Sequence, residues 1–289
     1  MTTFERRDRR STAADGSDPA LDSLVVLVAE SHGYVCRPVP GDVMLLDGPQ
    51  RLHIGMRNLR QLARQVPRDD WPALVADHVG TIITAIEEPL DLSDFALVRG
   101  LLRSRVYPVE ARTGRLISRP FAPGLIEAIV ADTPTTVRTV VTDDAITWPV
   151  TTDELFAVGR DGVRADGPLE CDVIDDTGIR VLEGSTFYAA THLVWLESYL
   201  DPGPYGALAV APTRSTIAAC SIRKDTALIT AERLRAFADD AHEDGPGSLT
   251  PDLFWWRDGT LTLLERSATG RASLPPDFLR FLDSLPRGA

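Results

Sequence analysis

Short apolar segments that are joined by tight turns and followed by a helical pattern restrict the fold of this chain more than any other feature. Three such segments, at 34–37, 43–46 and 51–54, are separated by Pro-Gly-Asp and Asp-Gly sequences, which are typical of hairpin turns. A helix that Ser17 or Asp18 can cap precedes them. An amphipathic helix, with apolar side chains at i, i+3, i+4 and i+7, follows them. This part of the chain therefore predicts the order α-β-β-β-α.

The same order of patterns occurs twice more along the chain. The helices that close the three copies align at Leu59, Leu155 and Leu234, each followed by a larger and then a smaller residue at i+3 and i+4. An internal repeat explains this order, and so does a chance alignment of common hairpin and helix patterns. The second copy is expected to contain a helix at 94–105 and strands at 125–131, 136–142 and 145–148. The third copy is expected to contain a helix at 186–200 and strands at 207–211, 216–222 and 226–229.

The fold class follows from these patterns and from a few elements between them. The chain is predicted to be α+β, built from repeated α-β-β-β-α units whose small antiparallel sheets are packed by helices. The additional elements are a helix at 71–87, a hairpin at 171–182, a hairpin at 253–265 and a last helix that contains Phe278 and Leu282. The expected division is a disordered tail at 1–17, then units at 18–90, 91–183 and 184–289, the last with the C-terminal hairpin and helix.

Composition restricts the class of partner. The chain has 289 residues, of which 44% are hydrophobic, and its 42 acidic and 30 basic side chains give a net charge of −12. Such an acidic protein is not expected to bind nucleic acid or a membrane. The polar first 17 residues contain no apolar signal segment, and the cysteines, Cys36, Cys171 and Cys220, are expected to be buried free thiols. We therefore expect an acidic cytoplasmic protein.

No sequence typical of a common catalytic or cofactor site occurs in the chain. The G-x-S-x-G, H-E-x-x-H, Walker and G-x-G-x-x-G sequences are all missing. The only lysine, Lys224, lies between charged neighbours in a predicted turn, where a reactive amine is not expected. The acidic cluster at 239–244 has no calcium-loop spacing and is expected to be a solvated helix end. We therefore expect no cofactor and no metal ion, and we assign no catalytic residue.

Arginines gather in and around a proline-containing loop in the second predicted unit. Arg99 and Arg103 are four residues apart on one face of a predicted helix, and Arg105 and Arg119 follow them. Such a local basic patch in an acidic protein can bind a carboxylate, a phosphate or an acidic segment of a partner. A solvated face is the alternative interpretation.

Three more residues complete the set of candidate contacts. Arg214 lies in a predicted turn between two strands. Trp255 and Trp256 are adjacent in a predicted strand, so their side chains are expected on opposite faces. One of them is then in the core, while the other either anchors an interface or lies under a helix or loop.

Several stretches of the chain resemble the YtpQ-like bacterial family. They are LHIGMRNL at 52–59, LRSRVYP at 102–108, TDEL at 152–155 and the Pro-Thr-Arg turn at 212–214. The family prefers Asp after that arginine, whereas this chain has Ser215. The resemblance covers most of the chain and implies a cytoplasmic protein with helices and strands, and it transfers no catalytic residues.

Two functions from different classes follow as hypotheses. The first is a non-enzymatic module of adaptor, chaperone or inhibitor type that binds a protein or peptide through exposed sheet edges or a groove between units. The second is an enzyme that acts on a small anionic substrate held by the arginines, with an unassigned carboxylate or His192 as the reacting group. Because the sequence shows no nucleophile–base pattern, it favours the binding module.

Overall fold

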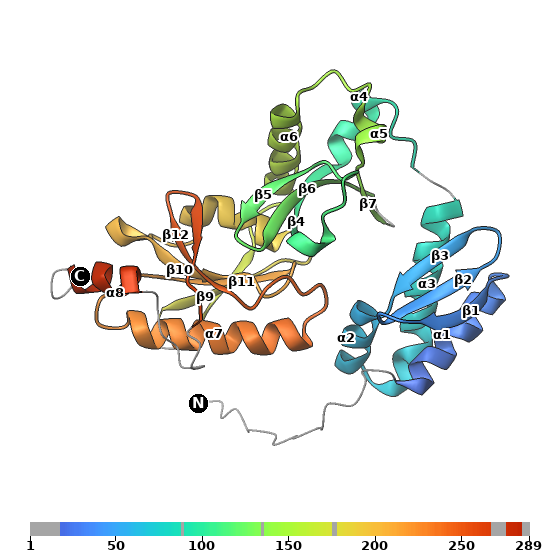
Figure 1. Cartoon of the computed structure of the whole chain (residues 1–289), viewed down its shortest axis with the longest axis horizontal. Helices are drawn as coiled ribbons and strands as arrows, with labels where there is room; N and C mark the ends of the chain where they lie inside the picture. The colour runs from blue at the N-terminus through green and yellow to red at the C-terminus, as the bar shows by residue number, and fades with distance from the viewer. Residues whose placement is uncertain (1–17, 88–89, 134–135, 175–177, 267–275, 285–289) are drawn as a thin grey trace. The chain divides into compact units, whose positions relative to one another are not determined.

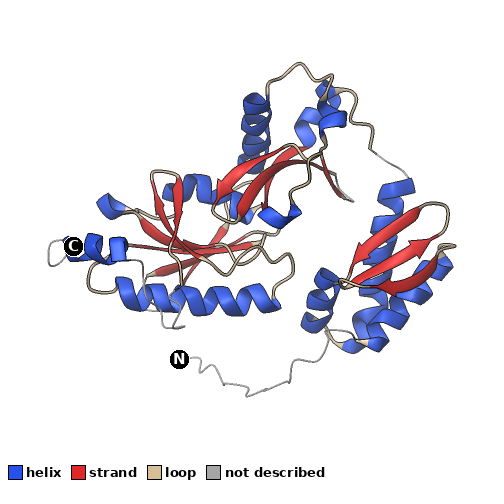
Figure 2. Ribbon diagram, in the orientation of Figure 1, coloured by secondary structure: helices blue, strands red, loops and turns tan. Residues whose placement is uncertain are grey.

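The chain folds into two compact units, Met1–Thr84 and Ala85–Ala289, which we name unit 1 and unit 2 and describe separately. The computed structural model describes residues 18–87, 90–133, 136–174, 178–266 and 276–284. The expected tail at 1–17 lies outside the described residues. Helices and small antiparallel sheets pack together in both units, so the predicted α+β class is confirmed (Figure 2).

Unit 1 has the α-β-β-β-α order that its turns predict. Asp18 caps the first helix, because its Oδ1 accepts a hydrogen bond from the Ala20 N–H at 3.0 Å. The three strands form an antiparallel meander in which Met44 lies opposite Ile54, and both side chains are buried. The elements are α1 (Pro19–Ser31), β1 (Val35–Val39), β2 (Val43–Asp47), β3 (Arg51–Gly55), α2 (Arg57–Gln65), the short 3₁₀ helix η1 (Arg68–Asp70) and α3 (Trp71–Glu87).

The larger sheet of unit 2 is antiparallel, with the strand order β13-β12-β10-β11-β9-β8. Its central strands are buried on both faces, and apolar residues alternate between two cores. Helices α7 and α8 cover one face, and the 3₁₀ helix η4 lies against the other (Figure 1). The elements are β8 (Glu170–Ile174), β9 (Ile179–Glu183), η4 (Ala189–Ser198), η5 (Gly203–Tyr205), β10 (Ala207–Val210), β11 (Thr216–Ser221), α7 (Ala227–Asp244), β12 (Leu253–Arg257), β13 (Thr260–Leu263) and α8 (Pro276–Ser284).

The smaller sheet of unit 2 is built around β6, which pairs with β4 on one side and with β5 and β7 on the other. Helix α6 packs on β4 and β6. Val106 and Leu125 of this sheet belong to the same apolar core as η4, so the two sheets share buried side chains. The elements are α4 (Phe95–Val98), η2 (Arg99–Leu101), β4 (Leu102–Pro108), η3 (Val109–Ala111), β5 (Ser118–Ala122), β6 (Leu125–Asp132), β7 (Val137–Thr139), α5 (Thr142–Ala145) and α6 (Thr152–Ala165).

Two expected strands are not strands in the structure, which corrects the sequence interpretation. The segment 226–229 is a short apolar run that joins the first turn of α7, because the helical spacing continues to the buried Leu234. The segment 145–148 follows the short helix α5, and Trp148 donates from its indole N–H to the Leu92 carbonyl at 2.8 Å. The third strand expected in the second copy and the third strand expected in the third copy are therefore both missing, and the threefold repeat is not confirmed.

Two expected helices also differ. The helix expected at 94–105 ends at Leu101, and the chain continues as strand β4. The element at 186–200 is a 3₁₀ helix, η4, with non-helical backbone angles at Trp195. The hairpin β8–β9 lies within the expected unit 91–183. In the structure it belongs to the same sheet as β10 and β11, which lie within the expected unit 184–289.

The expected burial of the cysteines is met only in part. Cys220 is buried and Cys36 is partly buried, but Cys171 is exposed on the edge strand β8, contrary to the expected burial. Among the described residues, none of the helices combines the length and apolar character that a membrane crossing requires. Within the same residues, no group of three or more His, Cys, Asp or Glu side chains is placed to hold a metal ion.

Candidate functional site

The seven candidate residues lie on four elements and one turn of unit 2. Arg99 lies in η2, where it is exposed. Arg103 and Arg105 lie on β4, Arg119 lies on β5 and Arg214 lies in the turn between β10 and β11. The two tryptophans lie on β12. Which of these residues can meet a ligand depends on the partners that the fold provides.

Arg103 is neutralised by a carboxylate within the protein. Its Nε and one terminal nitrogen each donate to an Asp166 carboxylate oxygen at 2.7 Å. Such a two-bond pair has a favourable planar geometry. Arg103 is therefore committed to holding the end of α6 against β4.

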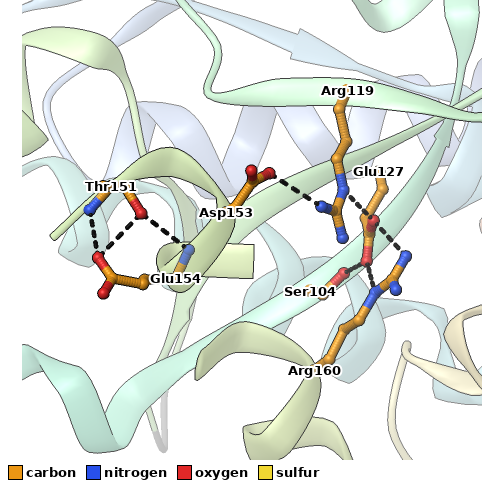
Figure 3. Close-up of polar contacts among 7 residues, drawn as sticks. All are labelled: Ser104, Arg119, Glu127, Thr151, Asp153, Glu154 and Arg160. Atoms are coloured by element: carbon orange, nitrogen blue, oxygen red, sulfur yellow. Dashed lines mark hydrogen bonds and ion pairs between the residues drawn. The ribbon is translucent and has the colours of Figure 1, made fainter. Parts of the chain in front are cut away.

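Arg119 is also engaged, in a buried cluster around Glu127 (Figure 3). The Glu127 side chain is fully buried, and Arg119 donates to it from Nε at 2.8 Å. Arg160 donates to both carboxylate oxygens at 2.6 and 2.8 Å, and the Ser104 hydroxyl donates to Oε1. Burial raises the pKa of Glu127, but the hydrogen bonds and charges of its partners outweigh burial, so its pKa lies below the ordinary value. Glu127 is thus an ionised carboxylate whose oxygens are all occupied.

Two glycines of α6 bring this helix close enough to the sheet for the cluster to form. A Cβ at Gly162 would lie 2.3 Å from the Leu102 carbonyl oxygen, and one at Gly159 would lie 3.0 Å from the Ser104 backbone nitrogen. The start of α6 is fixed by the expected capping box, in which Thr151 and Glu154 exchange hydrogen bonds (Figure 3).

His192, the residue considered for a reacting group, has a structural environment in η4. It is buried, and its Nδ1 accepts from the Tyr199 hydroxyl at 2.6 Å and from the Trp195 indole N–H at 3.2 Å. Because two donors meet Nδ1, the proton of the neutral ring lies on Nε2. Burial lowers the pKa of His192 to about 4, so the ring is neutral at pH 7.

The tryptophans of β12 are both covered. Trp256 is buried and donates to the Leu193 carbonyl at 2.7 Å. Trp255 donates to the Tyr205 carbonyl at 2.9 Å, and its ring packs on Phe281 of α8 with the ring centres 4.6 Å apart. The structure therefore shows the alternative in which a helix covers the second tryptophan.

Arg105 and Arg214 differ from the other candidates, because the fold brings them together without a carboxylate. The guanidinium carbons of Arg105 and Arg214 lie 5.2 and 5.1 Å from the centre of the same Tyr107 ring. Arg105 also lies 5.4 Å from the ring centre of Phe187. We name Arg105 and Arg214 the arginine pair. Among the described residues, neither guanidinium has a hydrogen bond or a salt bridge, and both Nε atoms are buried without a partner.

Local structure explains why these two side chains meet. Alternation along β4 places Arg105 and Tyr107 on the same face. Arg214 lies in a turn that is held by its own N–H, which donates to the Gly247 carbonyl at 3.0 Å. The aliphatic part of the Arg214 side chain lies beside Gly247, where a Cβ would be 3.3 Å from its Cδ. Both guanidinium groups are therefore positioned by backbone geometry rather than by a counter-ion.

The electrostatics of the arginine pair are unfavourable in the absence of an anion. Arg105 is only 7% exposed. Burial, and then the charge of Arg105, lowers the pKa of Arg214 to about 10, so Arg214 still carries its charge at pH 7. Stacking on Tyr107 offsets part of this cost, by about 0.5–2 kcal/mol for each cation. A carboxylate or phosphate bound by both guanidinium groups would offset the remainder.

Sequence reasoning missed several residues of these clusters. Glu127 is a single charged residue within an otherwise apolar strand, LIEAIVAD, and that isolation is a signal of a paired buried charge. Nothing in the sequence connects Tyr107 with Arg214 or Phe187 with Arg105, because tertiary folding alone brings them together.

No family model, curated protein or solved structure matches this chain. The resemblance to the YtpQ-like family therefore stays a prediction.

Proposed function

We propose that the chain is a non-enzymatic binding protein that holds an anionic group of a protein or peptide partner on the arginine pair. The single observation that supports this function is the pair of arginines, Arg105 buried and Arg214 half-buried, that approach the same Tyr107 ring and lack a carboxylate among the described residues. The protein carries a net charge of −12. The arginine pair is therefore a local positive site in an acidic protein.

Phe187 favours a peptide over a free inorganic anion. Its side chain is 47% exposed and lies beside Arg105. An exposed aromatic ring next to a pair of cations suits a ligand that has an apolar group beside its negative charge. A peptide with an acidic side chain and a neighbouring apolar side chain has this chemistry.

The enzyme alternative required a reactive carboxylate or His192. The Glu127 carboxylate already accepts four hydrogen bonds, and Nδ1 of His192 already accepts two. These contacts support a binding role for unit 2 over a catalytic one.

Fluorescence anisotropy with a labelled peptide of alternating Glu and Leu tests the proposal, and inorganic phosphate serves as the competitor. The full-length chain should bind this peptide, and it should not bind the matching Gln/Leu peptide. Arg105→Met and Arg214→Met should each weaken binding at least tenfold, as expected when a charged bidentate contact is lost.

Arg99→Met provides a matched control, because it removes the same charge from an exposed position. It should change the affinity less than twofold. An equal loss of affinity in the Arg99→Met chain would show that the peptide is held by general charge attraction and not by a specific site. Failure of the unmodified chain to bind either the acidic peptide or phosphate would also refute the proposal.

A further inference from the structure

The strand β8 forms an open edge of the six-stranded sheet. Within the described part of the chain it pairs with β9 alone, and all five of its residues are exposed. Val173 and Ile174 are 58% and 41% exposed. The opposite edge strand, β13, differs because it lies against β5 and buries Leu261. The backbone N–H and C=O groups along an exposed edge strand can pair with an added strand.

Two of the five side chains of β8 are acidic. Glu170 and Asp172 lie on one face of β8, and Glu183 of β9 lies directly opposite Glu170. Two like charges in a cross-strand pair are destabilising. Among the described residues, no salt bridge reaches any of these three carboxylates. A basic side chain placed beside β8 would relieve this repulsion.

The acidic side chains also discriminate between possible occupants. In the symmetric antiparallel pairing of two copies, Asp172 would face Asp172 of the second copy, since it is the central residue of the strand. That register adds another like-charge pair. A partner strand with alternating basic and apolar residues would instead place its cations beside Glu170 and Asp172 and its apolar groups beside Val173.

We propose that β8 binds an extended, basic segment of a partner protein by strand addition. Main-chain hydrogen bonds supply affinity, and the carboxylates along the edge select basic side chains. This surface uses residues different from the arginine pair, and the inference does not depend on the function proposed for that pair.

The binding of a labelled peptide of alternating Lys and Val to the full-length chain tests the inference, with a Glu/Val peptide as the comparison. The basic peptide should bind, and the acidic peptide should not bind at β8. Asp172→Lys should weaken binding of the basic peptide at least tenfold. Glu197→Lys makes the same change of charge at an exposed position in η4 and should alter the affinity less than twofold.

A second probe separates strand addition from simple charge attraction. Methylation of alternate backbone nitrogens of the Lys/Val peptide removes hydrogen bonds and keeps every charge, so it should abolish binding. Equal binding of the methylated peptide, or equal loss in the Glu197→Lys chain, would overturn the inference. Dimerisation through β8, seen by sedimentation and abolished in the Asp172→Lys chain, would also overturn it, because the occupant would then be a second copy.

Discussion

Replacement of Arg214 by methionine should stabilise the free protein. The pKa of Arg214 is lowered from the ordinary value of an arginine to about 10, chiefly by burial and then by the charge of Arg105. A change of tenfold in a proton equilibrium corresponds to about 1.4 kcal/mol. Keeping the guanidinium charged therefore costs the folded state up to about 3 kcal/mol at pH 7, and the cost persists at any pH below about 10.

Part of this gain is lost with the contacts that methionine cannot make. The interaction of the guanidinium with Tyr107 contributes about 0.5–2 kcal/mol. Methionine keeps the aliphatic stem that lies beside Gly247. The net expectation for Arg214→Met is an increase of about 2 kcal/mol in the free energy of unfolding, or a rise of about 4–8 °C in Tm for a domain of this size.

Urea unfolding in a buffer without phosphate or other multivalent anions measures this change. Arg99→Met serves as the control and should shift the free energy of unfolding by less than about 0.5 kcal/mol. The Arg214→Met chain should be more stable and should also lose binding of the acidic peptide. This combination is expected when residues of a binding site lower the stability of the free protein. Destabilisation by Arg214→Met would refute the reasoning, since it would show that the charge is already satisfied within the protein.

The other predictions concern the structural clusters. Glu127→Gln leaves two half-buried arginines without their anion and should lower the free energy of unfolding by about 3–5 kcal/mol. A loss below about 1 kcal/mol in urea unfolding would contradict the assignment of Glu127 as the anion of this cluster. Gly162→Ala places a Cβ against the Leu102 carbonyl and should lower the free energy of unfolding by about 1–3 kcal/mol. Gly80→Ala in α3 meets open space and should raise it by about 0.5–1 kcal/mol. Equal effects of the two substitutions in thermal unfolding would be inconsistent with the close packing of α6 on β4. His192 has a pKa of about 4 in the folded state and about 6.5 in the unfolded state. Because the unfolded chain binds the proton at the higher pH, the free energy of unfolding should fall by up to about 3 kcal/mol as the pH drops from 6.5 to 4. A His192→Gln chain should lose this part of the pH dependence.

The sequence predicted those elements of the fold that depend on local chemistry. The three strands of unit 1 follow from their turns, and the capping box at Thr151 marks the start of α6. Strand β4 was missed because apolar residues at helical spacing continue through Leu101 and Leu102, so its alternation was hidden. The helical start of α7 was assigned to a strand because a short apolar run fits both structures.

The candidate site was predictable only as a gathering of arginines. The tertiary structure distinguishes these arginines, because it places a carboxylate beside some of them and not beside others. Asp166 reaches Arg103, and Glu127 reaches Arg119, whereas Arg105 meets another arginine. Arg119 and Glu127 lie opposite each other in the β5–β6 hairpin, but the other two contacts join residues that are far apart in the chain, and no local pattern encodes them.

A double-mutant cycle between Arg105→Met and Arg214→Met, measured by urea unfolding with and without a saturating acidic peptide, tests the central claim most directly. Without the peptide, the coupling energy should be repulsive, because each substitution relieves the same clash of charges. With the peptide, the coupling should become attractive, because both guanidinium groups hold one anion. A coupling energy of the same sign and size in both conditions would contradict the account.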